Sequence, residues 1–117
     1  MCVVRHRTIP IMESHRVLFD QIEWQTPQPG ARFKVFRDGA TQVRLLELSP
    51  DFVESQWCEK GHIGFVEAGE LDINFCGDVV RFPQGSALLI PPGASHAHKA
   101  RAVTPVVRLF LVEDVSP

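Results

Sequence analysis

The sequence has little of what several classes of protein require. Its longest apolar runs are a few residues, far short of the ~20 needed to cross a bilayer as a helix. Its three cysteines are too few, and odd in number, for a disulfide framework. Lysine and arginine together number 12 against 14 acidic residues, so the net charge of −2 provides no broad positive field for a phosphate backbone. We therefore expect neither a nucleic-acid-binding protein nor a membrane protein.

Other familiar signals are also missing. Residues 1–7 lack the apolar stretch of a signal peptide, and free cysteines suit a reducing compartment, so the expected location is the cytoplasm. No phosphate-binding glycine loop of the Walker or Rossmann kind, no nucleophile elbow and no zinc-finger pairing is found. The expected partner is a small molecule.

The composition that remains is that of one globular domain. Hydrophobic residues make up 44% and charged residues 22% of the 117 residues, which argues against disorder. Nine prolines and eight glycines interrupt the chain often, and no stretch after residue 30 shows a sustained helical period. Frequent breaks favour many short strands over long helices.

The strands are predicted from alternation and turn signals. Asp38-Gly39 predicts a hairpin between residues 32–36 and 43–48. Further strands are expected over 63–66, 71–75, 79–82, 87–90 and 106–112. Short strands with turns between them predict a sandwich or barrel. Residues 1–30 are expected to form an N-terminal segment, as a rim strand or one exchanged in a dimer, and residues 31–117 to form the barrel.

The most specific segment runs from Gly85 to His96 and fits G-x5-P-x-G-x2-H. Pro91 cannot donate a hydrogen bond to a strand ladder, so the strand 87–90 should stop there. Pro92-Gly93 suits a tight turn with positive φ at the glycine. We expect the chain to re-enter a strand at His96, whose side chain the turn would aim.

This segment resembles the second motif of the cupin superfamily, G-x5-P-x-G-x2-H-x3-N, except that residue 100 is Ala in place of the terminal Asn. The resemblance implies an all-β, single-domain jelly-roll barrel, the double-stranded β-helix of cupins. It also implies that the motif side chains point into the barrel mouth. Many cupins hold a divalent metal there, and others hold none, so the fold does not decide the function.

The first cupin motif, G-x5-H-x-H-x3-4-E-x6-G, is matched at its closing glycine, Gly69. Counting back from Gly69, the glutamate of the family falls on His62. The H-x-H pair falls on Gln56 and Cys58 if the gap is three residues, or one residue earlier in each case if it is four.

With the shorter gap, the resemblance implies a metal site of Cys58, His62 and His96, with Gln56 and His98 as outer or substrate-binding groups. A thiolate disfavours manganese and suits zinc, or less well iron, so zinc is the favoured cofactor and iron the next. Two imidazoles and a thiolate with an open position match the plan of catalytic zinc sites. Such a metal acts as a Lewis acid or activates water. No catalytic residue is assigned.

The same residues also allow a protein without metal. Cys58 can pack as a small apolar group, and the histidines can hydrogen-bond each other or an organic ligand. The predicted function is therefore a small-molecule-binding cupin that is either a metal-dependent enzyme or a non-catalytic ligand-binding or sensor protein. A third alternative is a structural role through dimerisation, with side chains filling the barrel.

A homodimer is expected because single-barrel cupins commonly pair through a sheet face and exchange N-terminal strands. The residues support this with an apolar stretch outside the expected barrel, namely Val17, Leu18, Phe19, Ile22 and Trp24.

Overall fold

The structure is a computed structural model that describes residues 11–115, and no α-helix occurs in that range. The strands are β1 (Met12–Glu13), β2 (Arg16–Val17), β3 (Gln25–Gln28), β4 (Ala31–Asp38), β5 (Thr41–Leu48), β6 (His62–Ala68), β7 (Leu71–Phe75), β8 (Asp78–Phe82), β9 (Ala87–Ile90), β10 (Lys99–Ala102) and β11 (Val107–Asp114). Two 3₁₀ turns, η1 (Phe19–Gln21) and η2 (Ala94–His96), interrupt them. No helix within residues 11–115 has the length and apolar character needed to span a bilayer.

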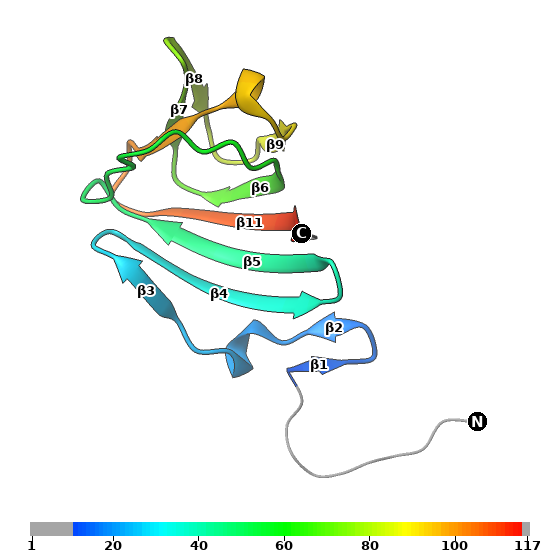
Figure 1. Ribbon diagram of the computed structural model, residues 1–117. Coiled ribbons are helices and arrows are strands. Elements are labelled where there is room, and N and C mark those ends of the chain that lie inside the picture. Colours follow the sequence, from blue (N-terminus) through cyan, green and yellow to red (C-terminus); the bar gives the residue numbers. More distant parts are fainter. Residues whose placement is uncertain (1–10, 116–117) are drawn as a thin grey trace.

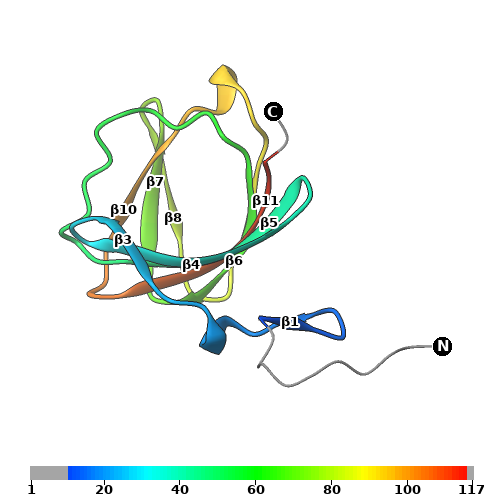
Figure 2. The same ribbon diagram turned by 60° about the horizontal axis from the view of Figure 1, so that its bottom comes forward.

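Two antiparallel sheets form the barrel (Figure 1). The larger has the strand order β3-β4-β5-β11-β6-β9, and the smaller has the order β10-β7-β8. Figure 2 shows the smaller sheet standing across from the curved larger one. The predicted all-β, single-domain jelly-roll architecture is confirmed.

The turn chemistry places the strands where the sequence predicts them. Asp38 pairs with Thr41, so β4 and β5 are joined by a two-residue turn in which Gly39 has φ +63°. β9 ends at Ile90, directly before Pro91, because proline has no N–H to continue the ladder. Gly93 has φ +119°, which confirms the predicted positive φ at that turn.

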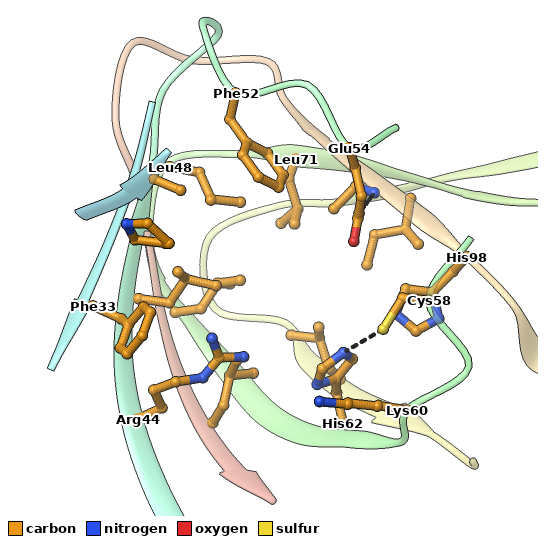
Figure 3. Close-up of a pocket in the computed structure, with 18 of the residues that line it drawn as sticks. Phe33, Arg44, Leu48, Phe52, Glu54, Cys58, Lys60, His62, Leu71 and His98 are labelled. Atoms are coloured by element: carbon orange, nitrogen blue, oxygen red, sulfur yellow. Dashed lines mark hydrogen bonds between the residues drawn. The ribbon is translucent and has the colours of Figure 1, made fainter. Parts of the chain in front are cut away.

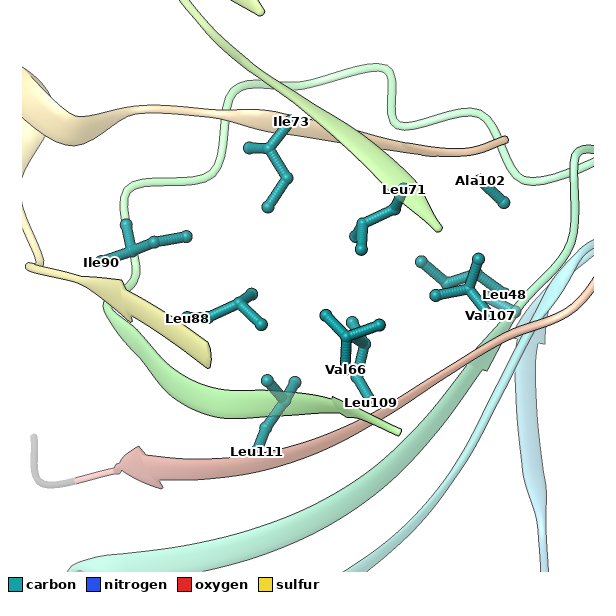
Figure 4. Packing of buried hydrophobic residues seen from close by; sticks show 11 residues of the cluster. Leu48, Val66, Leu71, Ile73, Leu88, Ile90, Ala102, Val107, Leu109 and Leu111 are labelled. Carbon is teal, nitrogen blue, oxygen red and sulfur yellow. The ribbon is translucent and has the colours of Figure 1, made fainter. Parts of the chain in front are cut away.

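The core lies between the two sheets, where their inward-facing side chains meet (Figure 4). Alternation along β11 illustrates the pattern, since Val107, Leu109 and Leu111 are buried while the residues between them are half-buried. The smaller sheet contributes Leu71 and Ile73 from β7. Burial of these side chains against each other holds the two sheets together.

The N-terminal part of the described chain lies against the outer surface of the larger sheet (Figure 2). The ring of Phe19 packs edge-on against Phe110 of β11, at 6.3 Å between centroids. Lys34 donates a hydrogen bond from Nζ to the backbone oxygen of Phe19 at 2.9 Å. β3 then forms the edge strand next to β4. Residues 1–10 of the predicted N-terminal segment lie outside the described residues, so the prediction for them is not tested. Residues 116–117 also lie outside the described range.

Candidate functional site

A cavity of about 350 Å³ lies inside the barrel (Figure 3). Most of its wall is apolar and includes Phe33, Phe52, Leu71 and Leu109. The polar and charged side chains on its wall are Gln28, Arg44, Glu54, Cys58, Lys60, His62 and His98. An apolar chamber with a few convergent polar groups is the usual form of a small-molecule site.

Cys58 reaches the cavity because the long loop between β5 and β6 pairs with the chain just before β10. The backbone N–H of Cys58 donates to the oxygen of His98 at 2.9 Å, and the N–H of His98 donates to the oxygen of Cys58 at 3.0 Å. This isolated bridge places the thiol beside the histidine. Cys58 is a half-buried, free cysteine, and Cys76 is an exposed one, so no disulfide links them.

The turn η2 decides which histidine of the second motif faces inward. His96 donates its N–H to Gly93 at 3.1 Å and Ala97 donates to Ala94 at 3.3 Å, so the chain makes a 3₁₀ turn here. The prediction that a strand resumes at His96 is therefore wrong, and β10 begins at Lys99. The extra turn carries His98, which is only 3% exposed, to the cavity wall.

The ring of His62 is oriented by a carboxylate at the end of β11. Its Nδ1 lies 3.0 Å from Oε2 of Glu113. Because Arg44 donates to both oxygens of that carboxylate, from Nε to Oε1 at 3.0 Å and from Nη2 to Oε2 at 2.7 Å, Glu113 is an acceptor and the His62 nitrogen donates. The neutral ring then carries its lone pair on Nε2, which faces the Cys58 thiol with Sγ 3.9 Å away.

The ring of His98 is oriented in the same way by the backbone. Its Nδ1 lies 3.0 Å from the carbonyl oxygen of His96, and a carbonyl can only accept, so Nδ1 carries the hydrogen. This leaves Nε2 as the free ring nitrogen. The rings of His62 and His98 meet edge to face with centroids 5.1 Å apart.

Three metal-binding side chains therefore converge. Donor atoms of Cys58, His62 and His98 all lie within 4.8 Å of one another. Of the predicted site residues, the structure brings Cys58 and His62 together, with His98 as the third member. His96 is outside this cluster and contributes its backbone oxygen to orient His98. Gln56 is exposed and does not line the cavity.

Glu113 is a residue of the candidate site that the cupin motifs did not indicate. It is 8% exposed and receives hydrogen bonds from three side chains, including Gln42 at 2.7 Å. Burial raises the pKa of Glu113, but the hydrogen bonds from His62 and Arg44, the charge of Arg44 and the hydrogen bond from Gln42 lower it to about 2. Glu113 is therefore ionised at neutral pH, which suits an acceptor that holds an imidazole in one tautomer.

The signal for Glu113 was present in the strand periodicity. Residues 107, 109, 111 and 113 share one face of β11, and the first three are apolar core residues. A carboxylate that continues a buried face needs a specific partner, because a lone buried charge is costly. The strand predicted from the sequence ends at residue 112, one residue before Glu113, whereas β11 continues to Asp114.

The residues present fit a divalent transition metal. Two imidazoles, each with Nδ1 engaged and Nε2 free, and one thiol make a donor set suited to zinc or iron. The Glu113–His62 contact is the carboxylate–histidine arrangement that commonly supports a metal-binding imidazole. Three protein ligands at a cavity wall leave a coordination position open toward that cavity.

No protein-family model matches the chain, and no curated protein sequence matches it. Solved structures do match. An RmlC-like cupin from Shewanella frigidimarina superposes with a TM-score of 0.70, at 13% identity over 89% of this chain and 93% of that one. KdgF from Halomonas sp. gives a TM-score of 0.66, at 22% identity over 81% of this chain and 90% of that one. The chain has the cupin fold. The Fe(II) form of HppE has a TM-score of 0.64, at 14% identity over 81% of this chain and 57% of that one.

The cupin fold confirms the resemblance drawn from the segment Gly85 to His96. At 22% identity or less, these similarities concern the fold. The geometry of Cys58, His62 and His98 is therefore the basis for any statement about chemistry.

Proposed function

We propose that this chain is a small-molecule-binding cupin in which Cys58, His62 and His98 hold a divalent metal at the wall of the cavity. The observation that carries the proposal is the convergence of three donor atoms within 4.8 Å beside a cavity of about 350 Å³. The thiolate makes zinc the favoured metal and iron the next. The Fe(II) form of HppE, which has a similar fold, supports iron as an occupant.

The chemistry that this metal would supply is Lewis-acid activation of a bound oxygen or water. The protein's own residues prepare the site for it. Glu113 fixes the tautomer of His62, the His96 carbonyl fixes that of His98, and the bridge between Cys58 and His98 holds the thiol in place. The wall around the open position is mostly apolar and would strengthen the interaction of the metal with a bound ligand, which favours a metal-dependent enzyme as the function.

A metal-free binding or sensor protein is the second candidate, and one observation favours it. The Cys58 thiol already contacts His62 at 3.9 Å, and the two histidine rings pack edge to face. The first contact gives the Cys58 thiol and the free nitrogen of His62 a partner without an ion.

Metal analysis of matched variants separates the two candidates. We expect the wild-type chain, purified without chelators or an affinity tag, to contain zinc or iron. Cys58→Ser and His98→Ala should lose more affinity than the roughly 10–100-fold that removal of an outer partner costs, because each removes a ligand atom. Cys76→Ser and His96→Ala are the controls and should bind metal as the wild type does, since neither side chain belongs to the cluster.

Cobalt(II) substitution adds a spectroscopic measurement, with a thiolate charge-transfer band expected in the wild type and absent in Cys58→Ser. Loss of metal in His96→Ala but not in His98→Ala would instead support the ligand set expected from the motif. A chain that contains no metal and takes up neither zinc nor iron would contradict the proposal and leave the metal-free candidate.

We also propose that the chain forms a homodimer through the outer face of the larger sheet. Ile63 on β6 pairs with Leu89 on β9, and these side chains are 56% and 79% exposed. Phe65, two residues along the same strand, is 46% exposed. An apolar patch of this kind on neighbouring strands is typical of an interaction surface, and a second copy is the simplest partner.

The double variant Ile63→Lys/Leu89→Lys tests the dimer, because two charges on the patch would oppose its burial. We expect light scattering to give a dimer for the wild type and a monomer for this variant. Val79→Lys is the control, because Val79 is 59% exposed but lies on β8 of the smaller sheet. A monomeric wild type, or an unchanged mass for the double variant, would contradict the proposal.

A further inference from the structure

We infer that the ligand of this cavity is a small monocarboxylate with an apolar body, and that Lys60 is the residue that recognises the carboxylate. The inference deepens the proposed function and rests on it, because it concerns the ligand of the same cavity. The observation that carries it is the charge of Lys60 at the cavity wall, which the metal proposal does not use.

Lys60 is an exposed cation at the edge of the cavity, and no residue of the described range 11–115 pairs with it. It lies in the sequence between Cys58 and His62, and its side chain lines the cavity. Figure 3 shows its amine beside the ring of His62, directed toward Arg44. Its Nζ makes no hydrogen bond and no ion pair within residues 11–115. An unpaired ammonium at the edge of a low-dielectric chamber attracts an anion.

The other cation on this side is already compensated. Arg44 donates hydrogen bonds from Nε and Nη2 to the carboxylate of Glu113, so the two charges of this pair largely cancel. The excess positive charge at this end of the cavity is therefore that of Lys60. The Nη1 group of Arg44 makes no hydrogen bond within the described residues and can donate to a second ligand oxygen.

The opposite wall limits the ligand to one negative group. Glu54 lies there, and Figure 3 shows its carboxylate pointing into the cavity. Its Oε1 accepts a hydrogen bond from the backbone N–H of Ala100 at 2.7 Å. A second carboxylate on the ligand would meet this charge, and like charges in an apolar chamber repel strongly. The charge of the cavity wall is thus positive at the Lys60 end and negative at the Glu54 end.

The space between these ends is apolar and small. Phe33, Phe52 and Leu71 line it, and the volume of about 350 Å³ is near the lower limit for ligand pockets. A compact hydrocarbon or aromatic body is the complement of such a wall, because it buries apolar surface without leaving a polar group unpaired.

Calorimetric titration of the full chain with three related molecules tests the ligand class. The molecules are 3-phenylpropionate, its neutral amide 3-phenylpropanamide, and the dicarboxylate phenylsuccinate. We expect the monocarboxylate to bind about tenfold more tightly than the amide, as a charged hydrogen bond allows, and the dicarboxylate to bind more weakly than the monocarboxylate. Equal affinity for acid and amide, or no binding of the acid at millimolar concentration, would overturn the inference.

Variants of Lys60 test whether this residue recognises the ligand carboxylate. Lys60→Met should weaken the acid about tenfold and leave the affinity for the amide unchanged, and Lys60→Arg should keep most of the preference. Arg37→Met is the control, because Arg37 borders an outer hollow and does not line the inner cavity. A Lys60→Met variant that binds acid and amide with equal losses, or with none, would contradict the role of Lys60.

Titrations of zinc-loaded and metal-stripped protein keep this inference separate from the metal proposal. A preference that depends on Lys60 in both forms supports the inference even if the chain proves to hold no metal. A preference seen only with zinc and unchanged in Lys60→Met would mean that the metal recognises the carboxylate, which would overturn the inference while leaving the metal site intact.

Discussion

Replacing Glu113 with glutamine is expected to lower the metal affinity by roughly 10–100-fold and the stability of the metal-free protein by about 3 kcal/mol. Three side chains, Gln42, Arg44 and His62, donate to the two carboxylate oxygens. Glutamine keeps the shape but replaces one acceptor oxygen with an NH₂ donor, so these donors cannot all be satisfied. Arg44 is left as a largely buried, uncompensated charge, and His62 loses the partner that fixes its tautomer. Zinc titration and urea unfolding measure the two effects.

The difference in unfolding free energy between the metal-free wild type and Glu113→Gln should become smaller as the pH falls. The pKa of Glu113 is about 2 in the folded protein and 4.5 is its ordinary value, so ionised Glu113 stabilises the fold. This contribution is complete above about pH 4.5 and is lost as the pH falls toward 2. The gap between the metal-free wild type and Glu113→Gln should therefore close in that range.

Two further variants isolate the cause. Glu47→Gln is the matched control, because Glu47 also accepts hydrogen bonds from two arginines, Arg32 and Arg108, but does not line the cavity. It should leave the metal affinity unchanged. Arg44→Met with Glu113→Leu removes both buried charges and should recover most of the stability while the metal affinity stays low. Recovery of metal binding in this double variant would contradict the role given to Glu113 in orienting His62.

Replacing Gly69 with alanine is expected to lower the free energy of unfolding by about 3 kcal/mol, from the sum of backbone strain and overpacking. Gly69 lies between β6 and β7 with φ +77°, where a Cβ is unfavourable. A Cβ built there would lie 2.5 Å from Oγ1 of Thr104 and closer still to the backbone oxygen of Val106. Thr104 cannot move freely, because its hydroxyl accepts from the N–H of Glu70 and donates to Val106. Thermal and urea unfolding measure the loss.

Gly39 provides the control with the same residue type and a similar backbone. Its φ is +63°, but no atom lies within 4 Å of a Cβ built on it. Gly39→Ala should therefore cost only the backbone strain of about 1–2 kcal/mol. Equal losses in the two variants would show that close packing at Gly69 contributes nothing.

Seven of the eleven strands in residues 11–115, namely β4 to β9 and β11, were predictable from the sequence because their boundaries are set locally. Asp38-Gly39 fixes one hairpin, and Pro91 ends β9 at the residue where its missing N–H requires it. The closing glycine of the first motif, Gly69, stands in the turn between β6 and β7 with φ +77°, a backbone conformation that other residues rarely adopt. Such constraints act within a few residues, so a single sequence reveals them.

The site was predictable only in part. Cys58 and His62 came from counting back along the first cupin motif, and the structure places them together. The choice between His96 and His98 could not be made from the sequence, because it depends on whether the chain after Gly93 runs straight or turns. The hydrogen bond from His96 to Gly93 closes a 3₁₀ turn. Because of this turn, His98 and not His96 lines the cavity.

The sequence by itself determined an all-β barrel with cupin-type turns, a chain poor in cysteine and net positive charge, and two of the three side chains in the cluster. Only the tertiary structure decided that His98 completes the cluster, that Glu113 orients His62, and that Lys60 lies at the cavity with no partner among residues 11–115. The reason is physical. Glu113 and His62 are 51 residues apart along the chain, and their contact exists because β11 lies between β5 and β6 in the sheet. A local pattern shows which side of a strand a residue faces, whereas the neighbour that it meets there is fixed by how the strands pair.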